Sequence, residues 1–532
     1  MVLQYHALIY IVDSKKGEKM SDGNKLVKSA TIIVVCTFIS KILGLLRDSV
    51  TAAKFGTIEL DAYNAASNLP MVLFIMIGAA ITTTLIPLYN EKRKQGKKEA
   101  CEFVSNVLNF FIFITVIISV MCVIFINPIV SLLNPGFVGG KLQFTKLLTI
   151  ILIPTLTVNA VLYIFNGMLQ SENNFAVPSL VALPFNVLII GYLFIFGKKY
   201  GVMGFTIITL IATAIQILPQ IPYVVKIGLK HSFKINFRDP MLKRMCLMLI
   251  PVILGTGVQQ INTFVERGVA TGYSAGSLSS LTYAYRVFAL FVDIFVVAIS
   301  TVIYPKMARQ TANNEMKEMK STLSESICTL IVFILPMSLI VMMQSKPIIY
   351  ILFERGAFTR SATDITSSVL CFYSLGLLAF GLRDFVCKAY YTLQDTKTPM
   401  INSAISLVLN IILIFIYKYF LGLKGLALAN ATSMYIACAL LIFSLRRKIG
   451  SMNGKKILIT AIKTIIASAV MLIVIYYLNM VLDLKYVSTV SVFIKILISS
   501  FAGVIVFIIT AFIVRMEEII KLKEMIMFRK AV

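Results

Sequence analysis

The sequence predicts an all-α polytopic membrane protein with about 14 transmembrane helices: two six-helix lobes related by a parallel repeat, plus two C-terminal helices. Of the 532 residues, 58% are hydrophobic and 14% are charged, whereas an ordinary soluble domain is about 45–50% apolar and about 25% charged. Apolar runs recur along the chain, and a crossing helix needs about 20 such residues. This pattern excludes a soluble enzyme with one membrane anchor, a disordered chain and a secreted disulfide scaffold.

Fourteen apolar runs separated by short polar breaks are the predicted spans. They lie near residues 29–46, 64–89, 103–126, 146–169, 175–197, 201–225, 245–265, 280–304, 323–344, 364–392, 400–420, 424–445, 457–480 and 490–514. A β-barrel is excluded, because its strands alternate polar and apolar residues instead of staying apolar for twenty positions.

The distribution of Lys and Arg predicts the orientation. With the N-terminus inside, the basic segments 92–98, 226–244, 306–320 and 446–456 all fall in cytoplasmic loops. By our count about 31 of the 50 basic residues then lie inside, as the positive-inside rule requires. We therefore expect both termini to be cytoplasmic. Residues 1–24 are expected to be a leader or cytoplasmic segment, because their apolar stretch is too short to span a bilayer, and Met20 is a candidate start.

An internal repeat defines the predicted domains. Pro178 matches Pro399, and the segment NPGF at 134–137 matches RGAF at 355–358, both at an offset of 221 residues. Six spans per copy give both copies the same orientation, which is typical of transporters that rock two lobes around a central site. The expected domains are an N-lobe (25–230), a C-lobe (231–450) and a C-terminal segment with the last two spans and a cytoplasmic tail (451–532).

Signals for catalysis are weak. His6 and His231 both lie outside the predicted spans, and the eight Cys show no C-x-x-C spacing. We therefore expect a protein that is not an enzyme, with no catalytic residues, no metal site and no cofactor.

Charged residues at membrane depth are the main candidates for function, because burying one in a bilayer costs about 2.5–3.5 kcal/mol or more. The candidates are Lys41, Arg47, Asp48, Arg286, Arg383 and Lys388. Snorkelling to the interface or local ion pairing is the competing interpretation. Asp61 is a further candidate, for which capping of a helix N-terminus is the alternative. Cations of both lobes facing one cleft would suit a delocalised anion such as a diphosphate, which Arg binds with two hydrogen bonds.

Four motifs resemble the MurJ/MviN family of lipid II flippases, within the multidrug/oligosaccharidyl-lipid/polysaccharide exporter superfamily. They are SKILGLLRDSVTAAKFG (40–56), LDAYNAASNLP (60–70), FERGAFT (353–359) and YYTLQDTKTP (390–399). The resemblance covers about residues 25–525. It implies two six-helix lobes and two extra helices that form a groove facing the lipid.

The family's substrate-binding residues carry over unevenly. Arg47 and Asp48 match its Arg-Asp pair, Asp61 its Asp at the second helix, and Arg286 its eighth-helix Arg. Lys41 stands where the family usually has Arg. In the second helix the usual Arg after Leu-Pro is absent, with Phe74 in that segment, and the usual Glu-Gly-Ala is Ile77-Gly78-Ala79. Arg383 and Lys388 could supply replacement charge.

The resemblance implies a flippase that moves the undecaprenyl-diphosphate-linked peptidoglycan precursor from the inner to the outer leaflet of the bacterial cytoplasmic membrane. We expect alternating access through a cationic central cavity, with membrane lipids and other cell-wall synthesis or division proteins as further partners and no nucleic acid. Coupling could use the membrane potential, Na⁺ or H⁺, with Glu266, Asn410 and Thr432 as candidate ion ligands.

Three alternatives remain open at this point. The cargo could be another polyprenyl-diphosphate glycan, such as a capsule or teichoic-type precursor. The chain could be a drug exporter of the same superfamily, although cationic drugs need carboxylates. It could also be a membrane glycosyltransferase, which the lack of clustered Asp or His disfavours.

Overall fold

The computed structural model describes residues 20–482 and 488–520, and within these ranges every regular element is an α-helix. The predicted all-α fold is therefore confirmed. Of the predicted leader (1–24), residues 1–19 lie outside the described part of the chain, as does His6.

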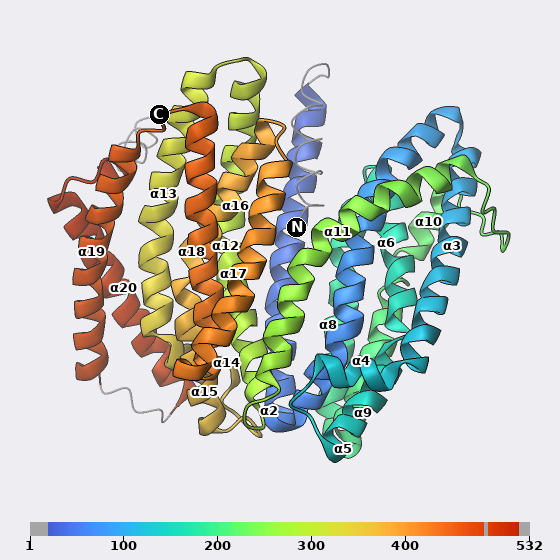
Figure 1. Cartoon of the computed structure of the whole chain (residues 1–532), viewed down its shortest axis with the longest axis horizontal. Helices are drawn as coiled ribbons and strands as arrows, with labels where there is room; N and C mark the ends of the chain where they lie inside the picture. Colours follow the sequence, from blue (N-terminus) through green and yellow to red (C-terminus); the bar gives the residue numbers. More distant parts are fainter. Residues whose placement is uncertain (1–19, 483–487, 521–532) are drawn as a thin grey trace. The chain divides into compact units, whose positions relative to one another are not determined.

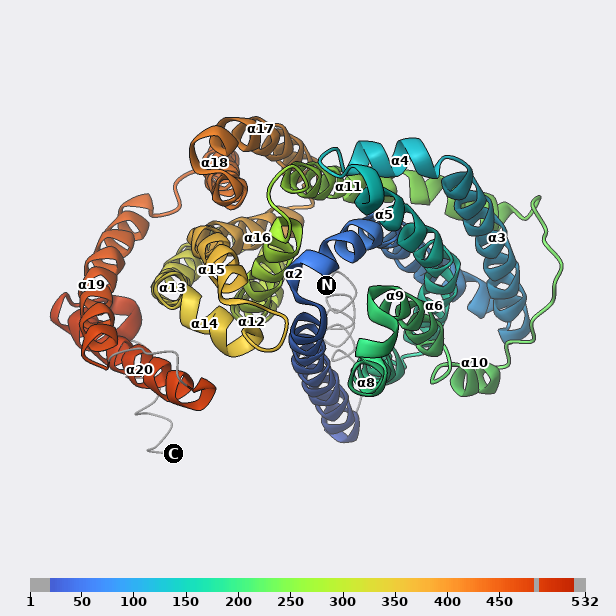
Figure 2. The same cartoon turned by 90° about the horizontal axis from the view of Figure 1, so that it is seen from below.

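The helices follow one another along the chain (Figures 1 and 2). They are α2 (Met20–Gln95), α3 (Lys97–Ile124), α4 (Ile126–Leu133), α5 (Gly139–Leu152), α6 (Thr155–Ser171), α7 (Ala176–Leu180), α8 (Ala182–Ile195), α9 (Gly197–Ile215), α10 (Ile221–Ile227), α11 (Pro240–Ala270), α12 (Ser277–Ala312), α13 (Met316–Met343), α14 (Ser345–Phe353), α15 (Arg360–Leu375), α16 (Leu377–Thr392), α17 (Lys397–Leu421), α18 (Leu423–Ile449), α19 (Gly454–Val481) and α20 (Thr489–Ile513).

The contacts divide the chain into two compact units. Unit 1 comprises the chain up to Ser279 together with Arg355–Phe358, and unit 2 comprises Ser280–Glu354 and the chain from Thr359 onward. Helix α11 belongs to unit 1 because it packs against α2, α3 and α4. Packing therefore places the division later in the chain than the repeat-based lobe boundary after residue 230, and the predicted lobes remain a prediction.

Unit 1 is built around the second half of α2. This segment packs against α3 and α6, and α11 joins the same core through Leu242 and Met245. In unit 2, α18 packs against α15, α16 and α17, and α19 packs against both α13 and α20. At the end of α13, the buried Gln344 side-chain amide donates to Asn479 of α19 at 3.3 Å and to Ser499 of α20 at 2.9 Å. The C-terminal helices are thus held to unit 2 by polar as well as apolar contacts.

Among the residues that the structure describes, eleven helices are long and apolar enough to cross a membrane, or twelve if the bent pair α15 and α16 forms one span. One of the eleven covers the 57 residues Ile39–Gln95. At 1.5 Å per residue a straight helix of that length would be about 85 Å long, far more than the roughly 30 Å of a bilayer core. The segment Ile39–Gln95 is not one straight helix, because α2 is interrupted at Gly56, where φ is 67°. To reach the predicted fourteen spans, α2 must count as two spans divided at Gly56, α15 and α16 must form one span, and α12 must also cross the membrane. The count of fourteen remains a prediction.

The two ends of unit 1 can be told apart by the residues that lie there. At one end, Glu172 of the α6–α7 connection accepts hydrogen bonds from Tyr89 at 2.6 Å and from Arg93 at 2.8 Å. Arg244 of α11 pairs with Glu91 at 2.8 Å. These contacts join the ends of α2, α6 and α11, which are the connections that the sequence predicts to be cytoplasmic. At the opposite end lie the break at Gly56 and the connections that the sequence predicts to be outside.

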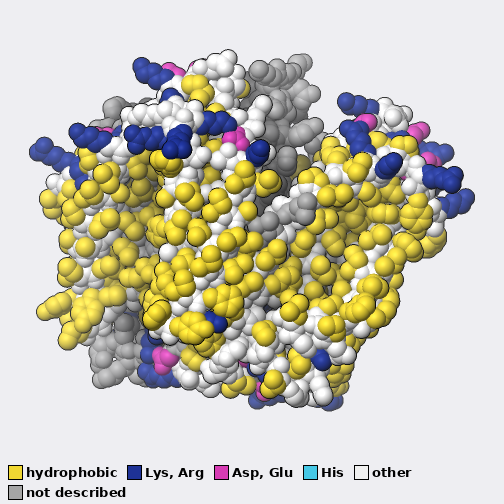
Figure 3. Space-filling model, viewed as in Figure 1, with side chains coloured by type: hydrophobic (Ala, Val, Ile, Leu, Met, Phe, Trp, Pro, Cys, Tyr) yellow, Lys and Arg dark blue, Asp and Glu magenta, His cyan; other side chains and the backbone are white. Residues whose placement is uncertain are grey.

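The molecular surface is that of a membrane protein. Figure 3 shows apolar side chains covering the flanks of the helices, with Lys and Arg gathered at helix ends. In α17, for example, Ile405, Val408, Ile412 and Phe415 are all exposed. Soluble proteins rarely expose apolar patches of this extent. The chain is a multi-pass membrane protein.

Candidate functional site

A buried polar face follows the break in α2. Asp61, Asn64 and Asn68 lie three and four residues apart, so they share one side of the helix. All three are almost completely buried, and Asp61 is only 1% exposed. Because buried polar groups are costly unless they are hydrogen-bonded, this face must have partners on neighbouring elements.

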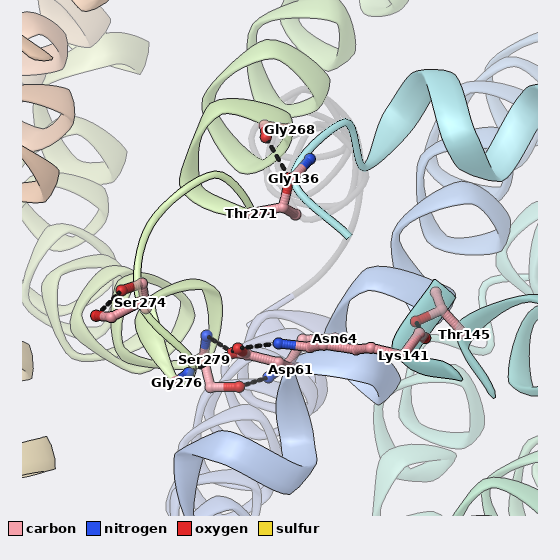
Figure 4. Close-up of polar contacts among 11 residues, drawn as sticks. Asp61, Asn64, Gly136, Lys141, Thr145, Gly268, Thr271, Ser274, Gly276 and Ser279 are labelled. Atoms are coloured by element: carbon pink, nitrogen blue, oxygen red, sulfur yellow. Dashed lines mark hydrogen bonds and ion pairs between the residues drawn. The ribbon is translucent and has the colours of Figure 1, made fainter. Parts of the chain in front are cut away.

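Asp61 has three such partners, shown in Figure 4. Its Oδ2 accepts from the backbone N–H of Gly276 at 2.7 Å and from Lys141 Nζ at 2.9 Å, and its Oδ1 accepts from the N–H of Ser279 at 2.9 Å. Gly276 and Ser279 lie at the start of α12. The carboxylate therefore caps a different helix from its own, where the unpaired N–H groups and the helix dipole favour negative charge.

The neighbouring contacts extend this arrangement. Asn64 Nδ2 donates to Ser279 Oγ at 2.9 Å, and we refer to Asp61, Asn64, Lys141, Gly276 and Ser279 as the Asp61 cluster. One turn further along α2, Asn68 Oδ1 accepts from Arg267 Nη1 of α11 at 3.1 Å. The turn from α11 into α12 is thus held by α2 on both sides.

Two glycine-containing loops complete this end of unit 1. In the first, the N–H of Gly136 donates to Thr271 Oγ1 at 3.1 Å, and a Cβ on Gly136 would lie 2.2 Å from the carbonyl oxygen of Thr271 (Figure 4). In the second, the N–H of Ala357 donates to the carbonyl oxygen of Ala53 at 2.8 Å. The two loops are the segments NPGF (134–137) and RGAF (355–358), which occupy equivalent positions in the sequence repeat.

The second loop packs backbone against backbone at the α2 break. A Cβ on Gly56 would lie 2.6 Å from the carbonyl oxygen of Ala357, and a Cβ on Gly356 would lie 2.2 Å from that of Ala53. Both glycines also have positive φ, 67° and 59°. Only residues without a side chain fit here.

The predicted cations Lys41 and Arg47 lie in α2 of unit 1, and both are half-buried. Arg47 donates to Asp48 Oδ1 from Nη2 at 2.8 Å and from Nε at 3.2 Å. Its guanidinium also lies over the ring of Phe185 in α8, 5.3 Å from the centroid. The predicted Arg-Asp pair is therefore a real ion pair, and the aromatic ring helps to fix its position.

The other predicted cations belong to unit 2. Arg286 is half-buried in α12 with its guanidinium 5.7 Å from the ring centroid of Tyr283. In α16, Arg383 Nη2 donates to Ser403 Oγ of α17 at 2.6 Å, whereas Lys388 is buried and pairs with Asp384 of its own helix at 2.5 Å. Arg383 and Lys388 thus have different partners. Arg383 Nε is buried and has no hydrogen-bond partner within the described ranges.

Helices α12 and α16 lie side by side in unit 2. The rings of Phe288 and Phe380 are 5.3 Å apart, and they stand two and three residues from Arg286 and Arg383 respectively. These two Arg residues are therefore carried by adjacent helices. A single cavity shared by the cations of both units remains a prediction.

The candidate ion ligands are also divided between the units. Glu266 is buried in α11 of unit 1, whereas Asn410 of α17 is buried and Thr432 of α18 is half-buried in unit 2. Helices α17 and α18 pack together. Their buried oxygens Asn402 Oδ1, Ser406 Oγ and Asn430 Oδ1 have no hydrogen-bond partner among the described residues. Neutral oxygens of this kind suit hard cations.

Sequence reasoning missed several of these residues. It singled out Asp61 but assigned any capping role to its own helix, and it did not consider Asn64, Asn68, Lys141 or Ser279. The three- and four-residue spacing of Asp61, Asn64 and Asn68 was a signal for a shared buried face. Nothing in the sequence around Lys141 points to Asp61, because that contact depends on how α5 packs against α2.

Comparisons with known proteins agree with this architecture. Residues 51–514 match the family model described as lipid II flippase MurJ. The probable lipid II flippase MurJ of Vibrio cholerae serotype O1 is 29% identical over 433 residues, covering 79% of this chain and 82% of the relative. That of Buchnera aphidicola subsp. Schizaphis graminum is 30% identical over 441 residues, covering 81% and 85%.

Solved structures share this fold. A lipid II flippase MurJ in an inward closed conformation has a TM-score of 0.77 and 31% identity, covering 91% of this chain and 98% of that one. An inward-facing MATE family multidrug resistance transporter of the MOP superfamily shares the fold, with a TM-score of 0.67 at 15% identity over 80% of this chain and 99% of that one. From the family match and the high coverage of these relatives, we conclude that the chain belongs to the lipid II flippase MurJ family.

Proposed function

We propose that this chain is a lipid II flippase of the bacterial cytoplasmic membrane. It carries the undecaprenyl-diphosphate-linked disaccharide peptide from the inner to the outer leaflet, and it makes and breaks no covalent bond. The observation that carries the proposal is the family match over residues 51–514, in a chain whose apolar helices hold charged residues at membrane depth.

The diphosphate is the part of this substrate that the cations would bind. Arg47 and Arg286 are the principal candidates, with Lys41 and Arg383 as further donors. A guanidinium presents several N–H groups in one plane and can bind two phosphate oxygens at once. Contacts with Phe185 and Tyr283 support this role, because an aromatic face restricts the guanidinium without using its donors.

The Asp61 cluster would control the position of Arg286. It fixes the first turn of α12, and Arg286 follows Ser279 by seven residues, or about 10 Å along the helix. A movement of α12 during alternating access would therefore have to break or carry along these contacts. In this proposal Asp61 is a positioning residue and does not itself contact the diphosphate.

In this proposal the membrane potential drives transport in the outward direction. Each elementary charge that crosses the membrane is worth about 2.3 kcal/mol per 100 mV. With the inside negative, the anionic head group is driven outward and an empty cationic cavity is drawn back inward. Na⁺ or H⁺ coupling is an alternative, for which Glu266, Asn410 and Thr432 are the candidate ligands.

Complementation tests this function. In a bacterium depleted of its own lipid II flippase, the chain should restore growth and cell shape and should abolish the accumulation of lipid II in the cytoplasmic leaflet. The variant Arg286→Ala should reach the membrane at the normal level but fail in both respects. If the parent chain leaves lipid II in the inner leaflet while clearing another polyprenyl-diphosphate glycan, its cargo is that glycan.

A further inference from the structure

The connection between α10 and α11 is a loop that lies against α3 and is held there by hydrogen bonds. We call residues 228–239 the α3-side loop; Figures 1 and 2 show it on the outer flank of that helix. Within 226–244 the sequence has six Lys or Arg residues and a single acidic residue, Asp239. The exposed residues of the loop include Phe233, which is 90% exposed, and Phe237, which is 57% exposed.

Three polar side chains of α3 hold the backbone of this loop. Ser105 Oγ accepts from the N–H of Ser232 at 3.0 Å, Asn109 Nδ2 donates to the carbonyl oxygen of Lys234 at 3.1 Å, and Asn106 Oδ1 accepts from the N–H of Asn236 at 2.8 Å. Ser105, Asn106 and Asn109 are all buried. These hydrogen bonds from α3 fix the backbone of the loop, while most of its residues are exposed.

The side chains that hold the loop lie in the apolar run of α3. The last charged residue of α3 before its apolar run is Glu102, and Asn109 follows it by seven residues, or about 10 Å along the helix. Near the membrane interface a non-helical backbone has less access to water, so protein partners for its N–H and C=O groups stabilise it. Farther along α3, the Phe237 ring packs edge-on against Phe110 and Phe113, with centroids 6.1 and 5.9 Å apart.

The cations of the loop have no acidic partner among the residues that the structure describes. Within the described ranges, Lys230, Lys234 and Arg238 form no ion pair, and all three are exposed. The one carboxylate, that of Asp239, accepts from the N–H of Met241 at 2.9 Å and from Asn106 Nδ2 at 3.2 Å. This carboxylate therefore caps the N-terminus of α11 and helps to hold the loop on α3.

From this arrangement we propose that the α3-side loop is a binding site for anionic phospholipid head groups, with Phe233 inserted among the lipids and Lys230, Lys234 and Arg238 contacting the phosphates. An exposed Phe flanked by cations is unfavourable in water but suits the membrane interface, where aromatic rings lie at head-group level and basic residues attract anionic lipids. The proposal rests on the loop and on the membrane location of the chain. It is independent of the transported substrate.

A tryptophan reporter tests the proposal directly, because the chain contains no Trp. In the full-length Phe233→Trp variant in neutral detergent, titration with dioctanoyl phosphatidylglycerol should shift the emission to shorter wavelength and saturate. Dioctanoyl phosphatidylcholine and inorganic phosphate should not produce this saturable shift. The matched reporter Leu132→Trp, at a position that is 81% exposed with no charged residue within five positions of it, should not respond.

Two sets of substitutions in the Phe233→Trp background test whether binding needs only the positive charge of the loop or also its fixed conformation. Replacing Lys230, Lys234 and Arg238 with Gln should weaken the apparent affinity for phosphatidylglycerol by roughly 100-fold. The Asn106→Ala and Asn109→Ala pair keeps every cation but releases the loop, and it should also weaken binding.

Equal responses to phosphatidylglycerol and phosphatidylcholine would contradict the proposal, as would an equal response of the Leu132→Trp reporter. So would full binding by the triple Gln variant, which would indicate another partner for the loop. If the double Ala variant does not fold, the triple Gln variant still decides the question, because its substitutions are all on exposed side chains.

Discussion

The carboxylate of Asp61 lies 2.9 Å from the ammonium of Lys141 and at the same time caps the first turn of α12. Asp61 has a side chain that is 2% exposed, whereas that of Lys141 is 33% exposed. One buried charge thus joins α2, α5 and α12. Because Lys141 can reach water, the contribution of this pair to stability comes mainly from the capping of α12 and less from the ion pair.

The first prediction follows from that asymmetry. Asp61→Asn removes the charge and presents an amide that can no longer accept from all three donors, so it should lower the free energy of unfolding by about 1–3 kcal/mol. Lys141→Gln leaves the two backbone N–H contacts in place and should cost less, about 0–1 kcal/mol. Thermal unfolding of the purified variants measures both. Equal losses, or a larger loss for Lys141→Gln, would show that the ion pair contributes more to the free energy of unfolding than the capping of α12.

The second prediction concerns the loop that closes on the α2 break. Gly356→Ala places a Cβ 2.2 Å from the carbonyl oxygen of Ala53 at a residue with φ of 59°. The backbone strain alone is worth about 1–3 kcal/mol, so we expect a clear loss of stability and of flipping activity. The matched control is Gly44→Ala in α2, where a Cβ would meet nothing within 4 Å. That variant should match or exceed the parent in stability; if the two variants behave alike, the close approach at Gly356 is not required.

The third prediction is a pH dependence at the connection between α16 and α17. Hydrogen bonds from Lys448 and from the N–H of Thr398 lower the pKa of Asp395 to about 2. A carboxyl whose pKa is lowered by folding stabilises the protein above its unfolded pKa of about 3.9. That contribution is lost as the pH falls through the folded value. Unfolding followed from pH 5 to pH 2 should show the parent losing its advantage over Asp395→Asn in this window; a constant difference down to pH 2 would contradict the assignment.

The fourth prediction concerns orientation. Lys94 lies at the end of unit 1 where Arg93 and Glu172 meet, and Gly140 lies beside Lys141 at the opposite end. Both positions are exposed, and a Cβ on Gly140 would meet nothing within 4 Å. In intact cells a membrane-impermeant thiol reagent should label Gly140→Cys above the background of the parent chain but should label Lys94→Cys only after permeabilisation. The reverse pattern would invert the predicted topology.

Much of the fold was predictable because it depends on local composition. The apolar runs, their lengths and the basic loops identified a polytopic helical membrane protein without any tertiary information. The break in α2 is more instructive. The predicted spans 29–46 and 64–89 implied an interruption, but not that it would be a single residue, Gly56, in an otherwise helical segment. The division after Ser279 was also not predictable, because it depends on α11 packing against α2.

The candidate site was predictable only in part. Arg47 with Asp48, and Lys388 with Asp384, form pairs that sequence proximity makes possible. In contrast, the contact of Arg383 with Ser403 joins residues twenty positions apart, and that of Asp61 with Ser279 joins residues 218 apart. Such contacts depend on helix packing. The sequence identified the charged residues in the apolar helices, but not the hydrogen-bond partners that Arg383 and Asp61 have on other helices.

The central claim is that intramembrane Arg residues move the diphosphate head group of lipid II across the bilayer. It is tested most directly in proteoliposomes that contain the purified chain and labelled lipid II, by following the fraction of label that changes leaflet with time. We predict rapid exchange for the parent, slower exchange for Arg286→Lys because the bidentate geometry is lost, and exchange at the rate of empty liposomes for Arg286→Ala. Exchange by Arg286→Ala at the parental rate, with the same amount of reconstituted protein, would contradict the claim.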